Sequence, residues 1–311
     1  MYSIDWAVKK EFKVYNINTK KFKSISPTRE TFDKFFNGFS NFHSFYIEEG
    51  GGDTFKLLAL KYGHQVFTTP GKKIKDFRDK LCLDKTDEND VKIIGIFAKK
   101  YSQEFYEYKK SDVLTLKIAI LHKEYCKIVK DSTRKKNQLF ALKKMLELLT
   151  SEKEIIRIIS KQKDTIKSFS REVRSINSQL LKLLKKHSLW NNYLKDVKGV
   201  GPIIAAGIIG SIRRFSRFSN KYSFRQFAGM VTKQNNFNYN RQLKQALYNF
   251  TEQIIKQKIQ PWRQLYDNMK MYYKEKHSDW IPGKIDAYAK KFVQTKFLDK
   301  LWINGIKIEI S

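Results

Sequence analysis

The chain opens with three short segments of alternating character, Tyr2-Ser-Ile-Asp-Trp-Ala7, Glu11-Phe-Lys-Val-Tyr-Asn-Ile17 and Lys21-Phe-Lys-Ser-Ile25. In the second segment Phe12 and Val14 alternate with lysines, and in the third Phe22 does the same. A period of two residues is typical of a strand with one buried face. We therefore predict a set of antiparallel strands at the start of the fold.

The next segments predict alternating helices and strands. Pro27-Thr28 opens a helix that runs to about Phe39, and Glu48-Glu49-Gly50-Gly51-Gly52 ends the following strand. In order, we expect a strand over His43–Ile47, a helix over Thr54–Tyr62, a strand over Gln65–Thr68 and a later helix after Lys85-Thr86. Hairpin strands that lead into parallel strands favour a ribonuclease H-like α/β domain.

From Ile118 the hydrophobic period changes to a heptad. The first register contains Ile118, Leu121, Tyr125, Ile128, Leu139, Leu142, Leu146 and Leu149. The second contains Ile166, Phe169, Val173, Ile176, Leu180 and Leu183. Such spacing predicts a coiled-coil seam on two successive helices that turn near Thr150-Ser151. An antiparallel hairpin within one chain and a dimer stalk would both satisfy it.

The remainder of the chain predicts helices only. The segment Asp196-Val-Lys-Gly-Val-Gly-Pro202 is a tight glycine turn before an apolar helix over Ile203–Ile212. Further helices are expected over Ser223–Met230, Asn240–Lys258, Trp262–Lys276 and Lys284–Trp302. The predicted organisation is therefore an α/β domain over 1–115, coiled-coil helices over 116–190 and an all-α domain over 191–311.

The charge of the chain indicates a polyanionic partner. The 311 residues include 62 Lys+Arg and 31 Asp+Glu, which gives a net charge of +31. Residues 1–122 carry a net +6, residues 123–190 a net +11 and residues 191–311 a net +14. Basic segments of this kind bind phosphate backbones. A lysine-rich surface without a ligand, produced by an AT-rich genome, is the alternative interpretation.

The cysteines and the hydropathy pattern predict the cellular setting. Two cysteines, Cys82 and Cys126, form no disulfide framework and fit no zinc spacing. The longest apolar stretch, Gly199–Ile212, is too short for a membrane span. An acidic residue at position 5 is also unlike a signal peptide. We expect a cytoplasmic protein associated with nucleic acid and without a membrane partner.

Four acidic residues occupy positions that suit a metal site. Asp5 lies within the first strand, Glu48 ends a central strand, and Asp87 and Asp90 share one face at a helix start. Convergent carboxylates bind Mg²⁺ or Mn²⁺ through oxygen, and two such ions support phosphodiester hydrolysis. The alternatives are a helix cap for Asp87 and a solvated strand end for Glu48, which has Glu49 beside it. A charge at Asp5 within a strand is expensive to bury without a partner.

These residues resemble the DEDD transposases of bridge-RNA-guided insertion sequences. The matching motifs are Ile4-Asp5, Glu48-Glu49-Gly50-Gly51, Lys85-Thr86-Asp87-Glu88-Asn89-Asp90, Gly199-Val-Gly-Pro202 with Ala205-Ala206, Arg214-Phe215 and Ala228-Gly229-Met230. The resemblance spans nearly the whole chain. It implies a RuvC-like nuclease domain with two metal ions per site, held by Asp5, Glu48, Asp87 and Asp90.

One segment departs from that family. After the Gly-Leu turn the transposases carry a loop with the serine nucleophile of recombination. Here the eleven residues from Met230 to Asn240 contain no serine. In this respect the chain is similar to the RuvC-bearing Tas proteins of TIGR-Tas systems, which cut DNA under guide-RNA direction. The segment from Ile203 to Met230 is also similar to the Nop domain of box C/D particles.

Two sets of residues are candidates for RNA binding. The turn Gly199, Val200, Gly201 presents backbone N–H groups at a helix start, which suits a phosphate or merely allows close packing. The second set contains Arg213, Arg214, Arg217, Lys233, Gln234, Asn235 and Arg241. Arginines interleaved with Phe215 and Phe218 suit RNA backbones and unstacked bases, although these phenylalanines can equally belong to a core.

Three functions remain open at this level. The preferred one is an RNA-guided DNA endonuclease with a guide RNA, a double-stranded DNA target and a homodimer built on the coiled coil. The second is an RNA-guided transposase or recombinase, which the absent serine disfavours. The third is an RNA-binding scaffold without catalytic activity, which is disfavoured because the four acids occur in the order of a nuclease motif.

Overall fold

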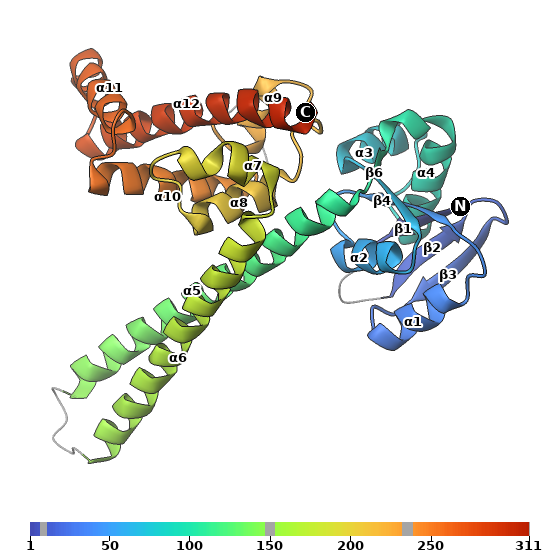
Figure 1. Ribbon diagram of the computed structural model, residues 1–311, viewed down its shortest axis with the longest axis horizontal. Helices are drawn as coiled ribbons and strands as arrows, with labels where there is room; N and C mark the ends of the chain where they lie inside the picture. The colour runs from blue at the N-terminus through green and yellow to red at the C-terminus, as the bar shows by residue number, and fades with distance from the viewer. Residues whose placement is uncertain (7–10, 147–152, 232–238, 311) are drawn as a thin grey trace. The chain divides into compact units, whose positions relative to one another are not determined.

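The computed structural model describes residues 1–6, 11–146, 153–231 and 239–310. The chain divides into two compact units, Met1–Val113 and Leu114–Ser311 (Figure 1). The first unit is a mixed α/β fold and the second is helical. This division confirms the predicted combination of an α/β part with an all-helical remainder.

A six-stranded sheet forms the centre of the first unit, in the order β3-β2-β1-β4-β5-β6. The strands are β1 (Tyr2–Asp5), β2 (Phe12–Asn16), β3 (Lys21–Ile25), β4 (Ser44–Glu48), β5 (Gln65–Thr69) and β6 (Tyr106–Glu107). Strand β1 pairs in parallel with β4, and β4 pairs in parallel with β5. The pairs β1–β2, β2–β3 and β5–β6 are antiparallel. The predicted sequence of hairpin strands followed by parallel strands is confirmed.

Helices cover both faces of this sheet. They are α1 (Arg29–Asn37), α2 (Asp53–Lys61), α3 (Gly71–Lys80) and α4 (Asp87–Lys100), with a 3-10 turn at Ser102–Glu104. Because side chains alternate along a strand, Phe45 and Tyr46 of β4 face opposite sides. The Phe45 ring lies 5.2 Å from that of Phe55 in α2. Tyr46 instead packs in a cluster with Phe77 of α3 and Ile94 of α4. Helices α1 and α2 therefore share one face, and α3 and α4 share the other.

The structure adds two elements that the sequence pattern did not predict. Helix α3 buries only Ile74 and Phe77 among its ten residues, and no side chain caps its start at Pro70. Two apolar positions are too few for a recognisable helical period. Strand β6 contains two residues and pairs only with β5. Both elements depend on contacts with the rest of the sheet rather than on local sequence.

An antiparallel helical hairpin begins the second unit. Helix α5 (Lys110–Leu146) and helix α6 (Lys153–Leu184) run in opposite directions beside each other (Figure 1). Burial follows the predicted seam, since Ile118 and Ile128 of α5 share a buried cluster with Ile176 and Leu180 of α6. The hairpin alternative is thus present within one chain. The predicted turn at Thr150-Ser151 lies outside the described residues.

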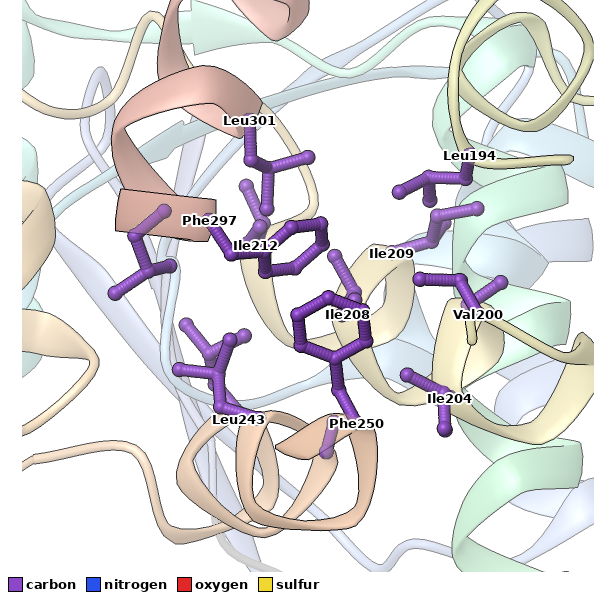
Figure 2. Close-up of a cluster of buried hydrophobic side chains, with 14 of the residues drawn as sticks. Leu194, Val200, Ile204, Ile208, Ile209, Ile212, Leu243, Phe250, Phe297 and Leu301 are labelled. Carbon is purple, nitrogen blue, oxygen red and sulfur yellow. The ribbon is translucent and has the colours of Figure 1, made fainter. Parts of the chain in front are cut away.

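The remaining helices share one buried core with α8 (Pro202–Ile212). They are α7 (Ser188–Asn192), α9 (Lys221–Phe227), α10 (Arg241–Gln257), α11 (Trp262–Lys276) and α12 (Pro282–Ile310), with a 3-10 turn at Leu194–Asp196. Helix α11 packs on α12 and α10. Helix α8 is apolar almost all round, as expected of a helix buried within a core. Figure 2 shows Ile208 and Ile212 of α8 beside Phe250 of α10 and Phe297 of α12. None of the described helices is long and apolar enough to cross a membrane.

Phe215 belongs to this core. From the sequence alone, the phenylalanines of the Arg-Phe segment (residues 213–218) suited both an RNA-binding surface and a core, and for Phe215 the structure shows the core. The side chain is 3 % exposed, and its ring lies 5.7 Å from Phe224 and 6.2 Å from Trp302. It also lies against the backbone of Gly305 in α12: a Cβ atom added there would come within 2.3 Å of the ring. The absence of a side chain at position 305 is therefore what lets α12 approach Phe215.

Gly305→Ala should destabilise the helical unit, because the added methyl group needs space that the Phe215 ring occupies. Overpacking of this kind costs about 1–3 kcal/mol. Thermal unfolding followed by circular dichroism measures the loss. The matched control is Gly283→Ala, since a Cβ at Gly283 meets no atom within 4 Å. Equal melting temperatures for the two variants would contradict the proposed packing constraint.

Candidate active site

Two of the predicted acids end adjacent parallel strands. Ile4 of β1 is the register partner of Ile47 of β4, so Asp5 and Glu48 follow at the carboxyl ends of neighbouring strands. Alternation places Asp5 on the same face as Ser3, and Glu48 on the same face as Tyr46. This is the face that α3 and α4 cover. The two carboxylates therefore lie at one edge of the sheet, beneath these helices.

Helix α4 brings the other two acids to the same place. Its N-cap is Thr86, whose hydroxyl accepts a hydrogen bond from the backbone N–H of Asn89 at 3.1 Å. Asp87 is thus the first helical residue and not the cap, which removes the capping alternative for this residue. The Ser3 hydroxyl donates to the carbonyl of Val91 at 2.7 Å, so α4 contacts β1 directly after its first turn.

Burial and mutual repulsion perturb the ionisation of Asp5. Its pKa rises to about 6, first because the carboxyl is withdrawn from water and then because of the charges of Asp90, Asp87 and Glu48. Lys85 opposes the rise. Burial is also the largest cause of the raised pKa of Glu48, followed by the charge of Asp90. The structure therefore brings the four predicted acids within electrostatic reach of one another, with Asp87 the most exposed.

Helix α3 contributes two residues to this site that sequence reasoning missed. The Arg78 guanidinium forms an ion pair with Asp90, with 2.6 Å between Nη1 and Oδ1, and both side chains are largely buried. The charge of the same arginine partly opposes the rise in the pKa of Glu48 that burial and Asp90 cause. Gly71 makes room for Glu48, since a Cβ there would lie 2.8 Å from Glu48 Oε1. The Thr-Pro-Gly sequence after β5 was the available signal for a turn at this edge.

A buried lysine supports the end of β4. Lys56 is fully buried; its ammonium donates to the carbonyl of Glu49 at 3.2 Å and lies 3.6 Å from Asp53. The backbone N–H of Glu49 donates to the carbonyl of Thr69 at 2.9 Å. Glu49 is itself buried, whereas Glu48 lies on the face with Asp5. These contacts distinguish the two neighbouring glutamates and favour Glu48 as the site residue.

The donor chemistry of this cluster suits a hard divalent cation. All four candidate ligands are carboxylates, the groups that Mg²⁺ and Mn²⁺ prefer. Among the described residues, however, no set of three or more His, Cys, Asp or Glu is already gathered as a metal-binding group. In this structure one of the four carboxylates, that of Asp90, is paired with Arg78 instead.

Three of the four predicted RNA-binding arginines are at least partly buried. Arg214 is 8 % exposed and Arg213 is half-buried at the end of α8. The Arg217 guanidinium lies 4.9 Å from the ring centre of Phe218 and 4.7 Å from that of Phe227, as in cation–π pairs. Arg241 is exposed at the start of α10.

The other predicted RNA contacts fall in two places. Gly199 adopts a φ of +95°, a conformation that favours glycine, and Val200 is buried. Gly201 follows as the N-cap of α8, where an added Cβ would meet no atom within 4 Å. The turn thus combines one position that needs glycine with one that faces open space. Lys233, Gln234 and Asn235 lie outside the described residues.

Comparison with known proteins relates part of the helical unit to a family of transposases. Residues 191–267 match the model of the transposase IS116/IS110/IS902 family. This segment runs from the end of α7 through α10 into α11. No curated protein matches the chain. The match supports a relation to these transposases and indicates a nucleic-acid-processing enzyme.

Asp5→Asn should stabilise the protein at neutral pH, in buffer with EDTA, by about 1 kcal/mol after allowance for solvent screening. The pKa of Asp5 is raised in the folded state to about 6 from 3.8. Its contribution to stability is therefore fully present below pH 3.8 and is lost as the pH rises through 6. The two proteins should melt alike near pH 4 and diverge by pH 7.5. A difference in melting temperature that stays constant across this range would contradict the assignment.

Proposed function

We propose that this protein is an RNA-guided DNA endonuclease that hydrolyses phosphodiester bonds at the site of Asp5, Glu48, Asp87 and Asp90. The observation that carries the proposal is the convergence of these carboxylates at the ends of β1 and β4 and the start of α4. The match of residues 191–267 to a transposase family supports action on DNA. The sheet order, with its hairpin and parallel strands, is consistent with a RuvC or ribonuclease H-like domain.

The four carboxylates would hold two Mg²⁺ or Mn²⁺ ions. When bound, such ions supply a water of lowered pKa and stabilise the leaving 3′-oxygen. Asp5 and Glu48 are anchored by the sheet, so they provide the fixed part of the ligand set. Asp90 has to separate from Arg78 before it can serve as a ligand through the same oxygen. Arg78 would then be free to pair with a phosphate of the substrate.

Hydrolysis is favoured over strand joining by the segment after Gly229. The eleven residues from Met230 to Asn240 contain no serine to form a covalent seryl intermediate. A transposase or recombinase is nonetheless the second candidate, because the matched family consists of transposases. An array of short RNA repeats beside the gene would favour the endonuclease, whereas transposon ends would favour the second candidate. A scaffold without catalytic activity would not account for four acidic residues that occur in the order of a nuclease motif.

In this proposal residues 191–311 form a Nop-like domain that binds the guide RNA. This segment has the highest net charge of the three, at +14. Arg213, Arg217 and Arg241 keep part of their side chains at the surface, and Lys233, Gln234 and Asn235 add polar groups nearby in sequence. Arg214 is buried, so its contribution is to the shape of the segment. The proposed target is double-stranded DNA. The protein itself would be a cytoplasmic protein of a prokaryotic cell or of its virus.

Asp5→Ala should reduce Mg²⁺-dependent cleavage of target DNA by at least 100-fold, while nucleic-acid binding changes little. The side chain is one of the two anchored ligands, and the surface for RNA lies in other residues. Cleavage is measured on gels with the RNA-loaded full-length protein. Glu88→Ala is the matched control, because Glu88 is an exposed acid between Asp87 and Asp90 in sequence.

Two results would overturn this assignment. One is undiminished cleavage by Asp5→Ala, and the other is undiminished cleavage by the wild type in EDTA. Strand-joined products, in place of free ends, would instead support the recombinase.

We also propose that the hairpin of α5 and α6 supports a homodimer with one active site per subunit. Large apolar side chains stay exposed toward its distal end, including Phe140 at 62 %, Met145 at 58 % and Ile156 at 61 %. Exposed apolar residues of this kind mark interaction surfaces. Light scattering of the RNA-loaded protein should give two chains of 36.9 kDa each. Phe140→Ser with Ile156→Ser should shift the complex to one chain, and a wild-type monomer would refute the dimer.

A further inference from the structure

A groove of about 690 Å³ lies in the helical unit beside the glycine turn at 199–201. Its lining comes from Tyr125 of α5, Asn177 of α6, the start of α8 and one face of α10. These segments are far apart in sequence, so the fold creates the groove. The acidic site of the first unit contributes nothing to it.

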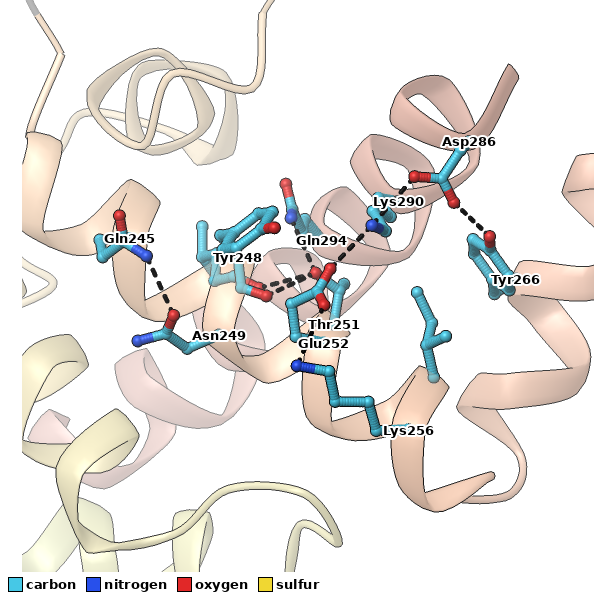
Figure 3. A network of polar contacts seen from close by, with 12 residues as sticks. Gln245, Tyr248, Asn249, Thr251, Glu252, Lys256, Tyr266, Asp286, Lys290 and Gln294 are labelled. Atoms are coloured by element: carbon cyan, nitrogen blue, oxygen red, sulfur yellow. Dashed lines mark hydrogen bonds and ion pairs between the residues drawn. The ribbon is translucent and has the colours of Figure 1, made fainter. Parts of the chain in front are cut away.

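A row of primary amides runs along one wall. Gln245, Asn249, Gln253 and Gln257 recur every four residues of α10 and therefore share one face of the helix. The last three line the groove. Gln245 donates to Asn249 at 2.9 Å, and Gln257 donates to Gln253 at 2.7 Å (Figure 3 draws the first pair). Each amide has two donor hydrogens and two acceptor lone pairs, so one bond per pair leaves capacity for a ligand.

The groove is close to neutral, in contrast to the net charge of the chain. Glu252 accepts a bond from Lys290 at 2.7 Å and lies 3.6 Å from Lys256, an arrangement visible in Figure 3. The hydrogen bond from Lys290 is the largest of the causes that lower the pKa of Glu252. The one acid in the lining is thus compensated by two lysines. A surface that binds a phosphate backbone would carry positively charged side chains without acidic partners. The polar lining of this groove instead consists mainly of amide groups.

An aromatic residue and an open glycine complete the lining. Tyr248 precedes Asn249, lines the groove and is 46 % exposed. A tyrosine ring of this exposure provides a surface for base stacking. Gly201, the N-cap of α8, also lines the groove and presents open space where a side chain would begin.

We propose that this groove binds an unpaired segment of nucleic acid, with base edges on the amide row of α10 and one base against Tyr248. Asn and Gln side chains pair with base edges through a donor and an acceptor together. In a duplex those edges are paired with each other, so an unpaired segment fits the lining better. The inference rests on the proposed function only in that the chain acts on nucleic acid.

The test is fluorescence anisotropy with full-length protein in EDTA. The probes are a fluorescein-labelled 15-nucleotide RNA of mixed sequence, the DNA of the same sequence, and that DNA as a duplex. Gly201→Leu places a side chain in the groove at a position with a φ of −86°, which any residue adopts. It should weaken single-strand binding at least tenfold, about 1.4 kcal/mol. Gly283→Leu also enters open space but lies outside the lining, so it should bind as the wild type does.

A second variant guards against a folding defect in the first. Gln253 is half-buried in the lining of the groove and lies outside the hydrophobic core, so Gln253→Leu should weaken binding about fivefold with an unchanged melting curve. Because amides contact bases and not phosphates, the dependence of affinity on salt should keep its wild-type slope. The ratio of the effects on the RNA and the DNA identifies which strand the groove takes.

Three results would overturn the inference. They are wild-type binding by Gly201→Leu, equal weakening of duplex binding, and a reduced salt slope for Gln253→Leu. The outcome is separate from that of the proposed function, because binding in EDTA requires no cleavage. A protein that binds through the groove yet never cuts DNA would refute only the endonuclease. A protein that cuts normally with Gly201→Leu, and binds single strands normally, would refute only the groove.

Discussion

The contact between helix α4 and strand β1 is the constraint on which the acidic site depends. The Ser3 hydroxyl reaches the Val91 carbonyl at 2.7 Å, and a Cβ at Gly95 would lie only 3.0 Å from that same hydroxyl oxygen. A bulkier residue at either position would lift the helix from the sheet. The first turn of α4, with Asp87 and Asp90, would then move away from Asp5. Small side chains in the middle of these elements thus set the distance between acids at their ends.

Much of the first unit could be predicted because strand alternation is a local property. Phe12 and Val14 are two residues apart and are both buried in a strand, as expected. Helix α3 could not be predicted, since it has two buried positions and is held by contacts with α4 and the sheet. Arg78 was missed for the same reason. A residue on an unpredicted helix cannot be assigned to a site, although its partner Asp90 is only twelve positions away.

The helical unit shows a different limit of sequence reasoning. Its heptads gave the seam of the hairpin, because a repeat over several turns leaves few alternative arrangements. The Arg-Phe segment had no such repeat, and its phenylalanines suited both a core and an RNA surface. The contact that places Phe215 in the core comes from Gly305, ninety residues later. Similarly, Glu252 finds its strongest partner in Lys290 of a different helix, 38 residues away. Contacts of this range become evident only when the helices are placed in space.

The ion pair between Arg78 and Asp90 has a consequence for the order of events at the acidic site. In this state the protein supplies its own counter-ion to a group of four carboxylates. A divalent ion that took Asp90 Oδ1 would therefore bind by exchange, and its apparent affinity would be lowered by the free energy of the ion pair that it replaced. The same exchange would release the Arg78 guanidinium at the edge of the site while the bound cation compensated the negative charge of the carboxylates. If the proposed cation binds in this way, the affinity of this edge for a phosphate would rise after the metal has bound, and the cation would favour the later binding of a nucleic acid strand.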